Sequence, residues 1–188
     1  PNEILRCLVG TEMCIRDSLN IYSFDNEITN KQADELILNI DNSFFYQHYK
    51  SIETNGLIIK SNNSKGVMIK GYDEYDKNHY LFNSINRGTL IQNPKSEILI
   101  GDSLANEMNL SVGDKVKIAI PKTDKTILGN IPRFKTLEVV GVFDLGLYEY
   151  DSNLIFLSSE LVRKLLLYDE DIYNLSLIHI SEPTRHRR

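Results

Sequence analysis

The chain has 188 residues, with 21 Lys and Arg against 26 Asp and Glu, and a formal net charge of −5 at pH 7. This acidic balance offers no basic field that could follow phosphates, which argues against nucleic-acid binding. No apolar run approaches the roughly 20 residues needed to span a bilayer, so we expect no transmembrane helix within the printed sequence.

The two ends of the chain are related at the level of DNA. Residues 12–18 (EMCIRDS) can be encoded by the short DNA read GAGATGTGTATAAGAGACAG, and the reverse complement of that read can encode residues 175–181 (LSLIHIS). Both ends therefore resemble translated transposon-type sequencing adapter, and such segments are left out of fold reasoning. We expect residues 1–18 and 175–188 to be non-native and residues 19–174 to be a fragment of one natural domain.

Leaving out these ends changes the chemistry that the chain can perform. Both cysteines and two of the four histidines lie in them, so residues 19–174 have no cysteine and only His48 and His79. Five of the 21 basic and four of the 26 acidic residues are also lost, which leaves 16 against 22. Disulfides, thiolate catalysis and Cys/His zinc sites are thereby excluded, and we expect no metal and no cofactor.

The first half of the natural segment predicts one helix and a few strands. Apolar residues recur at helical spacing from Ile28 to Ile40, and Thr29 is a candidate cap. Aromatic and β-branched residues from Phe44 to Lys60 predict one or two strands, followed by a turn at 61–66 and a strand at Val67–Gly71. Residues 72–94 are polar and weakly patterned, so we expect a surface connection with little structure.

The second half is patterned more sharply. Four segments predict short strands: Glu97–Gly101, Lys115–Ile120, Thr136–Phe143 and Ser152–Leu157. Two segments have helical spacing: Asp102–Met108, with Asp102 as its cap, and Glu160–Tyr168, capped by Ser158 and Ser159. Together these elements predict a mixed α+β domain in which strands outnumber helices.

The most informative internal segment is the predicted loop Pro121–Arg133. It is about a dozen residues long, whereas hairpin loops usually have about two to five. It combines exposed apolar residues, two prolines and a basic base, in the order Lys117, Pro121, Ile127, Leu128, Ile131, Pro132, Arg133 and Lys135. A long hairpin with an apolar tip above a basic base is a shape that docks a partner. The alternative is a loop that folds back on its own domain.

Other polar clusters have simpler explanations. The acidic run Asp73–Asp76 lacks the spacing of a calcium-binding EF-hand loop, so a solvated turn is favoured. Asp144, Glu149 and Asp151 flank a glycine-containing turn without a nearby nucleophile, which favours surface and turn roles over acid–base catalysis. His48 and His79 each stand alone, and Gly101 is not followed by the glycine and lysine of a phosphate-binding loop. The sequence shows no enzyme site.

From residue 97 onwards the order of motifs resembles a known family. The run from Ile98 to Val116 (ILIGDSLANEMNLSVGDKV) is similar to the periplasmic core domain of MacB/FtsX-type ABC permeases, and Gly66–Asp73 resembles an earlier strand of that domain. The segments Ile120–Pro121, Leu128–Pro132, Val139–Phe143 and Tyr148–Asp151 resemble the LolC/LolE lipoprotein-releasing permeases. Each motif alone is weak, but the ordered series is fairly specific.

The resemblance implies a domain that projects into the periplasm from the inner membrane, between transmembrane helices that the fragment lacks. In LolC a hairpin called the hook captures the soluble lipoprotein chaperone LolA. The strand pair around residues 117–135 occupies that place here. By position the hook residues are Lys117, Pro121, Ile127, Leu128, Gly129, Ile131, Pro132, Arg133, Phe134 and Lys135. LolE-type subunits lack a functional hook, so the Gly-Asn-Ile-Pro run favours a LolC-like or single hybrid subunit.

The hypothesis that follows is a non-catalytic permease domain that hands lipoproteins to a LolA-like chaperone, with a separate ATPase subunit and a second permease subunit as partners. A second hypothesis keeps the fold and changes the task to a MacB-like exporter or an FtsX-like recruiter of a cell-wall hydrolase. A third is a soluble hydrolase that uses Asp144, Glu149 or Asp151, which predicts a pocket with converging carboxylates.

Overall fold

The fold is known from a computed structural model, which describes residues 6–9, 18–22, 28–29, 31, 35, 45–72, 80–126, 129–168, 172–173 and 175–180. The chain divides into two units, one of residues 52–168 and the other of residues 1–51 with 169–188. Each unit is described by itself below. Among the described residues no helix has the length and apolar character that a membrane span requires.

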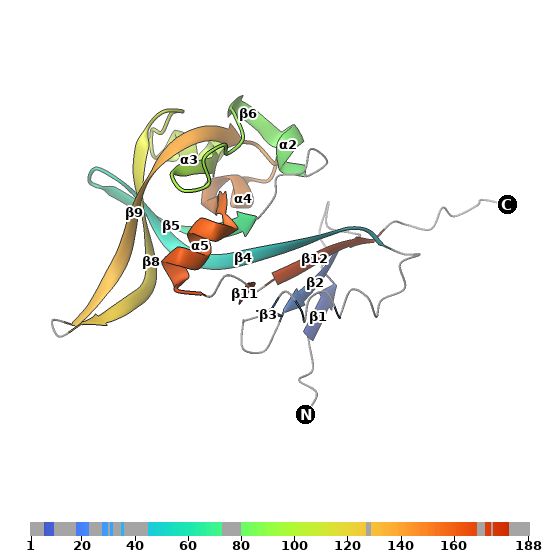
Figure 1. The fold of residues 1–188 in the computed structure, drawn as a ribbon. Coiled ribbons are helices and arrows are strands. Elements are labelled where there is room, and N and C mark those ends of the chain that lie inside the picture. The colour runs from blue at the N-terminus through green and yellow to red at the C-terminus, as the bar shows by residue number, and fades with distance from the viewer. Residues whose placement is uncertain are drawn as a thin grey trace. The chain divides into compact units, whose positions relative to one another are not determined.

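The larger unit, residues 52–168, is built on strands whose pairings close into a ring (Figure 1). Its strands are the second part of β4 (Phe45–Lys60), β5 (Asn63–Tyr72), β6 (Ile85–Gly88), β7 (Glu97–Gly101), β8 (Lys115–Thr126), β9 (Gly129–Phe143) and β10 (Leu154–Ser158). The order β4–β5–β10–β7–β9 is closed by β8, which pairs with both β9 and β4. Strand β6 pairs with the C-terminal end of β9, at Gly141–Phe143, beyond the stretch that pairs with β8. The mixed α+β fold predicted from the sequence is confirmed.

The ring mixes parallel and antiparallel neighbours. Strands β5 and β10 are parallel, as are β7 and β9, whereas β7 pairs antiparallel with β10 and β8 pairs antiparallel with β9. The interior of the closed sheet is apolar. It includes an edge-to-face contact between the aromatic side chains of Phe143 and Phe156, whose centroids are 5.0 Å apart. Strand β10 is buried along its whole length, which explains its continuous apolar run, Leu154–Leu157.

Four short helices accompany these strands in the described part of the unit: α2 (Tyr80–Ser84), α3 (Asp102–Glu107), α4 (Tyr148–Asn153) and α5 (Ser159–Leu166). Helix α3 is confirmed, but Asp102 is its first residue and not its cap, because Gly101 occupies that position. Asp102 instead accepts hydrogen bonds from Arg87 and Asn106. Helix α4 replaces the start of the predicted Ser152–Leu157 strand.

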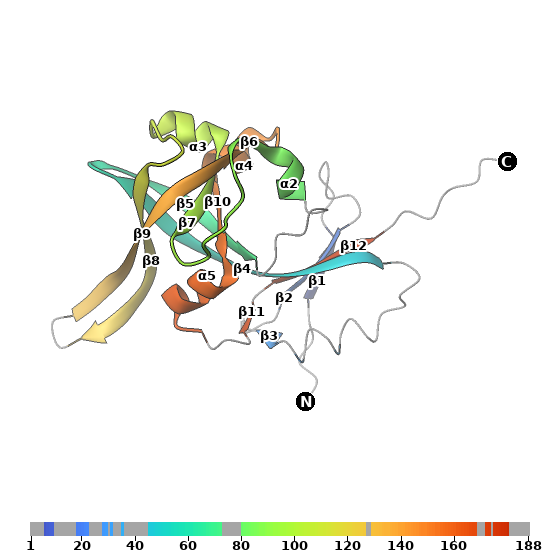
Figure 2. The same cartoon turned by 45° about the horizontal axis from the view of Figure 1, so that its top comes forward.

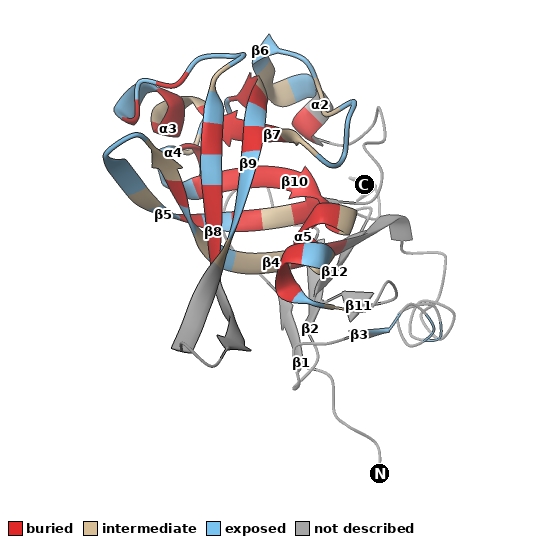
Figure 3. Ribbon diagram, turned by 60° about the vertical axis from the view of Figure 1, so that its left-hand side comes forward, coloured by how far each residue is buried: buried red, intermediate tan, exposed pale blue. Residues whose placement is uncertain are grey.

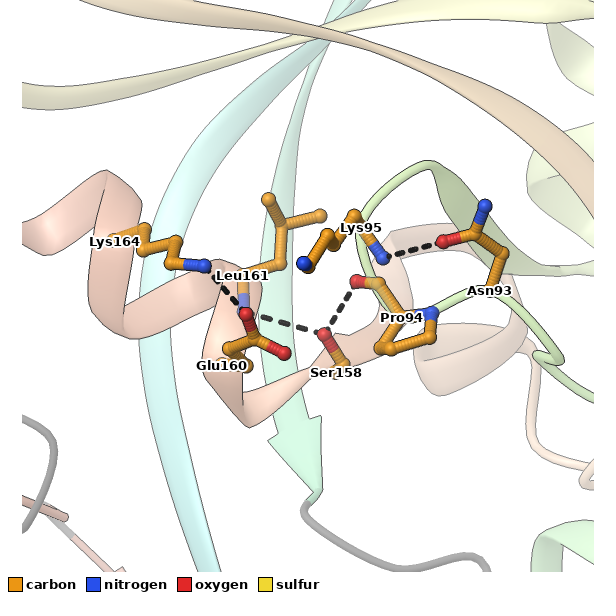
Figure 4. A network of polar contacts seen from close by, with 7 residues as sticks. All are labelled: Asn93, Pro94, Lys95, Ser158, Glu160, Leu161 and Lys164. Carbon is orange, nitrogen blue, oxygen red and sulfur yellow. Dashed lines mark hydrogen bonds and ion pairs between the residues drawn. The ribbon is translucent and has the colours of Figure 1, made fainter.

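Helix α5 is fixed at its N-terminal end by the predicted cap. The Ser158 hydroxyl accepts the N–H of Leu161 at 3.2 Å and donates to the carbonyl of Pro94 at 2.6 Å (Figure 4). Glu160 pairs with Lys164 one turn along the same helix. Ser159 is the first helical residue and is fully buried, so only Ser158 of the two predicted caps has that role.

Several predicted boundaries are wrong. Strand β5 begins at Asn63, within the predicted turn at 61–66, because a two-residue turn is enough to join it to β4. Residues 72–94 contain α2 and β6, and β6 is recruited by pairing with β9, which its own sequence does not signal. Residues 73–79, which include the acidic run and His79, lie outside the described residues.

The smaller unit contains β1 (Arg6–Val9), β2 (Ser18–Tyr22), β12 (Leu175–Ile180) and residues 45–51 of β4. These strands pair in that order, and each pair is antiparallel. A separate pair joins β3 (Ile28–Thr29) to β11 (Ile172–Tyr173). Ile28 and Thr29 therefore lie in a strand and not in the predicted helix. Of that predicted helix only Lys31 and Glu35 are described, and both are helical. The non-native origin of 1–18 and 175–188 stays a prediction.

Gly101 allows α4 to approach β7 closely. A Cβ at this position would lie 2.2 Å from the backbone oxygen of Asp151, although the backbone angles of Gly101 suit any residue. We expect Gly101→Ala to lower the free energy of unfolding by about 1–3 kcal/mol through overpacking, measured by urea unfolding. The matched control is Gly66→Ala, where a Cβ would meet nothing within 4 Å. Equal stability of the two variants would contradict this packing account.

Candidate docking arm

The predicted loop Pro121–Pro132 is in fact part of two long strands. The β8–β9 register continues from Lys115↔Glu138 to Thr126↔Gly129, so this prediction is wrong. The prolines do not prevent pairing. The register shifts between Ile120 and Thr123, which places Pro121 in a bulge where no ladder N–H is needed. Pro132 pairs opposite Thr123 in a part of the hairpin where the described strands pair only with each other, so the outer edge of each needs no ladder N–H from the described residues.

The outer part of this hairpin leaves the ring as a two-stranded arm, which we define as residues 120–126 and 129–133. Strand β4 pairs with β8 only at Lys117–Ala119, and β7 pairs with β9 only from Glu138 onwards. Beyond those points the described pairings of β8 and β9 are with each other. Two views show the arm projecting from the body of the larger unit (Figures 1 and 2).

The two lysines predicted at the base of the hairpin face opposite sides. Lys117 pairs with Thr136, whereas Lys135 pairs with Ile118, the next residue along β8. Successive residues of a strand point to opposite faces, so one face carries Lys117 and the other carries Lys135. Both lysines are exposed. Buried and exposed positions alternate along β8 and β9 in the body of the unit (Figure 3). The basic base predicted from the sequence is therefore divided between the two faces of the arm.

Phe134 lies on the same face as Lys117 and is 55% exposed. It pairs with Ala119, which in turn pairs with Leu57 of β4, itself 46% exposed. The three residues form an apolar row across three adjacent strands. Leu57 was missed by sequence reasoning. Leu57, Ile58 and Ile59 are all apolar, so the sequence carries no alternation that distinguishes them, and only the structure shows that Leu57 is exposed and Ile58 buried.

Arg133 is half-buried and contacts the body of its own unit. Its Nη1 donates to the carbonyl oxygen of Lys164, in α5, at 3.2 Å. The structure thus brings Arg133 toward α5 and separates it from Lys117, which lies on the other face of the hairpin.

The remaining predicted residues of the arm are placed only in part. Ile127 and Leu128 lie outside the described residues. Gly129, Ile131 and Pro132 are placed by their backbone pairing in β9, and Pro121 lies in the bulge of β8.

The acidic residues near the Gly146 turn have the turn roles that the sequence favours. Asp144 accepts the N–H of Gly146 at 2.9 Å. Asp151 is 4% exposed, against the surface position expected, and its two carboxylate oxygens accept the N–H groups of Leu145 and Leu147. Burial raises the pKa of Asp151; the two N–H bonds oppose this shift, and neighbouring Asp144 adds to it. Glu149 is exposed.

Among the described residues, no group of three or more His, Cys, Asp or Glu side chains could hold a metal ion.

The start of β8 is fixed by a polar junction with the end of β4. The ammonium of Lys60 donates to Asp114 Oδ2 at 2.8 Å and to the carbonyl of Asn109 at 2.6 Å. The same Asp114 oxygen accepts the N–H of Ser111 at 2.8 Å. The hydrogen bond from Lys60, and then that from Ser111, hold the pKa of Asp114 below its ordinary value.

With these positions in place, the chain can be compared with known proteins. No family model matches it. It is 33% identical over 81 residues to the lipoprotein-releasing system transmembrane protein LolC of Neisseria meningitidis, covering 43% of this chain and 20% of that protein. It is 35% identical over 72 residues to LolC of Xylella fastidiosa, covering 38% and 17%. The chain thus matches about a fifth of the length of these relatives.

Solved structures give the fold. The periplasmic region of MacB from Actinobacillus actinomycetemcomitans superposes with a TM-score of 0.56 at 14% identity, over 90% of this chain and 77% of that one. The extracellular domain of the ABC-type transporter YknZ, from Gram-positive bacteria, gives 0.55 at 13% identity, over 85% and 75%. The fold is that of MacB-type extracytoplasmic domains. The resemblance to LolC and MacB predicted from the sequence is confirmed.

The Asp114 junction predicts an acid-dependent loss of stability. Because the pKa of Asp114 is lowered in the folded state, its ionised form stabilises the fold at neutral pH. This stabilisation is lost when the pH falls below the ordinary pKa of about 3.9 and through the lower pKa of the folded state. Asp114→Asn keeps an acceptor for Ser111 but loses the charge that faces Lys60. We expect urea unfolding to show a small destabilisation at pH 7 that disappears in acid. The matched control is Glu138→Gln, at an exposed position of β9. A loss of stability in Asp114→Asn that is the same at pH 7 and in acid would contradict this assignment.

Proposed function

We propose that this chain is the periplasmic domain of a lipoprotein-releasing ABC permease, and that its arm docks a soluble lipoprotein chaperone of the LolA type. The observation that carries the proposal is the two-stranded arm, which leaves a MacB-type body in a chain similar in sequence to LolC. The domain itself performs no chemistry in this proposal. A separate ATPase subunit supplies the work, and a second permease subunit completes the membrane part.

The shape and chemistry of the arm support this role. A ribbon of two strands offers free backbone edges along its length and an apolar tip sequence, Ile127-Leu128, at its end. Edge pairing and apolar contact are the two ways in which such a hairpin engages a partner. At its base, Lys117 and Phe134 face one side and Lys135 the other, so a partner that grips the arm from both sides meets a positive charge on each.

Lysine at positions 117 and 135 limits the kind of electrostatic contact that the arm can make. An ammonium acts as a point charge and cannot form the two parallel hydrogen bonds of an arginine with a carboxylate. Exposed charges of this kind accelerate encounter and set orientation more than they add affinity. In this proposal the apolar tip supplies most of the affinity.

A second candidate function rests on the fold alone. The similarity to MacB and YknZ is equally consistent with an exporter domain of another ABC-type system. That family resemblance includes proteins without the Gly-x-Ile-Pro hairpin, so the arm distinguishes the two functions. Binding of the partner without any contact to the arm would favour the exporter function.

The tip residues provide the direct test. We expect the double variant Ile127→Asp/Leu128→Asp to lose most binding to a LolA-type chaperone in a pull-down from purified components, because two charges would have to be buried at an apolar contact. The matched control is Val112→Asp/Tyr148→Asp, which places the same charges on exposed apolar residues of the body.

Circular dichroism would verify that both double variants keep the fold. Binding that survives in the tip variant, with the control also binding, would contradict the assignment of the arm as the docking site.

A further inference from the structure

The arm leaves the body at a point where its backbone is poorly restrained. Lateral pairing with β4 ends at Ala119, and the bulge after Ile120 interrupts the ladder between β8 and β9. Bulges bend and twist a strand locally, and an isolated two-stranded ribbon is marginally stable in water. The direction of the arm therefore depends on contacts made at its root.

Arg133 occupies that root. It pairs opposite Ile120, the last residue of β8 before the bulge. Ile120 is 1% exposed, so this pair still belongs to the buried body. From this position the guanidinium of Arg133 reaches α5 and donates to the carbonyl oxygen of Lys164 at 3.2 Å.

The acceptor belongs to the last turn of α5. The final four carbonyls of a helix lack partners within the helix, and the negative end of the helix dipole favours a cation there. The N–H of Tyr168 satisfies the carbonyl of Arg163, and Leu167 adopts the left-handed conformation that ends the helix. Arg133 donates to the next carbonyl of the helix, that of Lys164, although Arg133 lies 31 residues away in sequence, in strand β9.

Helix α5 is a fixed point for such a contact. Its N-terminal end is capped by Ser158, whose hydroxyl also binds the carbonyl of Pro94 (Figure 4). Its inner face is buried along its length through Leu161, Val162 and Leu165. A hydrogen bond to the end of this helix therefore ties the root of the arm to the rigid body.

We propose that Arg133 is a positioning residue that sets the direction of the docking arm by clamping its root to the C-terminal end of α5. Its role is intramolecular, unlike the partner contact implied by the resemblance. The effect on chaperone binding rests on the proposed function, whereas the effect on the arm's direction does not. Preorganisation of the arm then lowers the cost of ordering it when a partner binds.

Distances between spin labels test the clamp directly. With Cys7→Ser and Cys14→Ser as background, labels at Lys125→Cys on the arm and Asn106→Cys on α3 report the direction of the arm by pulsed electron paramagnetic resonance. We expect one narrow distance distribution with Arg133 present and a clearly broader one in Arg133→Ala. Arg133→Lys, which keeps a charged donor without the planar fork, should give an intermediate width.

Lys135→Ala is the matched control, because it removes a cation two residues away on the same face of β9. Its distribution should equal that of the parent. An unchanged width in Arg133→Ala, with circular dichroism showing a folded protein, overturns the proposal. If Arg133→Ala is destabilised, Arg133→Met decides, because it keeps an aliphatic side chain without a donor: a parent-like width in that variant also overturns the proposal.

Chaperone binding separates this proposal from the proposed function. We expect Arg133→Ala to weaken binding about three- to tenfold, the effect of losing one hydrogen bond of ordinary strength within the domain. Failure of the parent chain to bind any LolA-type chaperone would contradict the proposed function while leaving the distance result to decide the clamp. Weaker binding with an unchanged distance distribution would instead make Arg133 a direct partner contact and would overturn the clamp.

Discussion

The structure depends on one strand, β9, which runs through both the closed sheet of the body and the projecting arm. The C-terminal part of β9, residues 138–143, pairs with β7 of the closed ring and with the added strand β6, while its N-terminal part pairs with β8 as far as Gly129. Because side chains alternate along β9 from Val139 back to Gly129, the register that buries Leu137 and Val139 also fixes which residues of the arm's β9 strand face each side. The body therefore dictates the geometry of its own protrusion.

Polar contacts hold the elements from which the arm emerges. The Lys60–Asp114 pair ties the start of β8 to β4, and Ser158 ties the start of α5 to the loop at Pro94. The Lys60–Asp114 pair is partly exposed, so it contributes little to the free energy of unfolding. The two contacts act on geometry, because they keep β8 and α5 in place; Arg133 of β9 pairs with β8 and donates to α5. A rigid body with a clamped arm is a reasonable design for a protein that presents a docking element to a soluble partner.

The sequence predicts the elements whose pattern of apolar residues and caps lies within one segment. It does not predict the features that depend on pairing between distant strands. Strand Glu97–Gly101 and the Ser158-capped helix were predicted, since their apolar pattern and cap are written in neighbouring residues. The arm was predicted as a loop because Pro121 and Pro132 usually break strands, whereas the bulge and the free edges of the ribbon accommodate them. The opposite facing of Lys117 and Lys135 follows only from the cross-strand register, which no single segment contains.

The central claim is that the arm, and not the body, meets the partner. The most direct measurement is photo-crosslinking of the full chain to a LolA-type chaperone, with a photoreactive residue placed singly at four positions. Thr126 and Asn130 lie on the arm, and Asn106 and Asn153 are exposed on the body. Our account predicts crosslinks from the two arm positions and none from the body positions. Crosslinks from the body with none from the arm would contradict it.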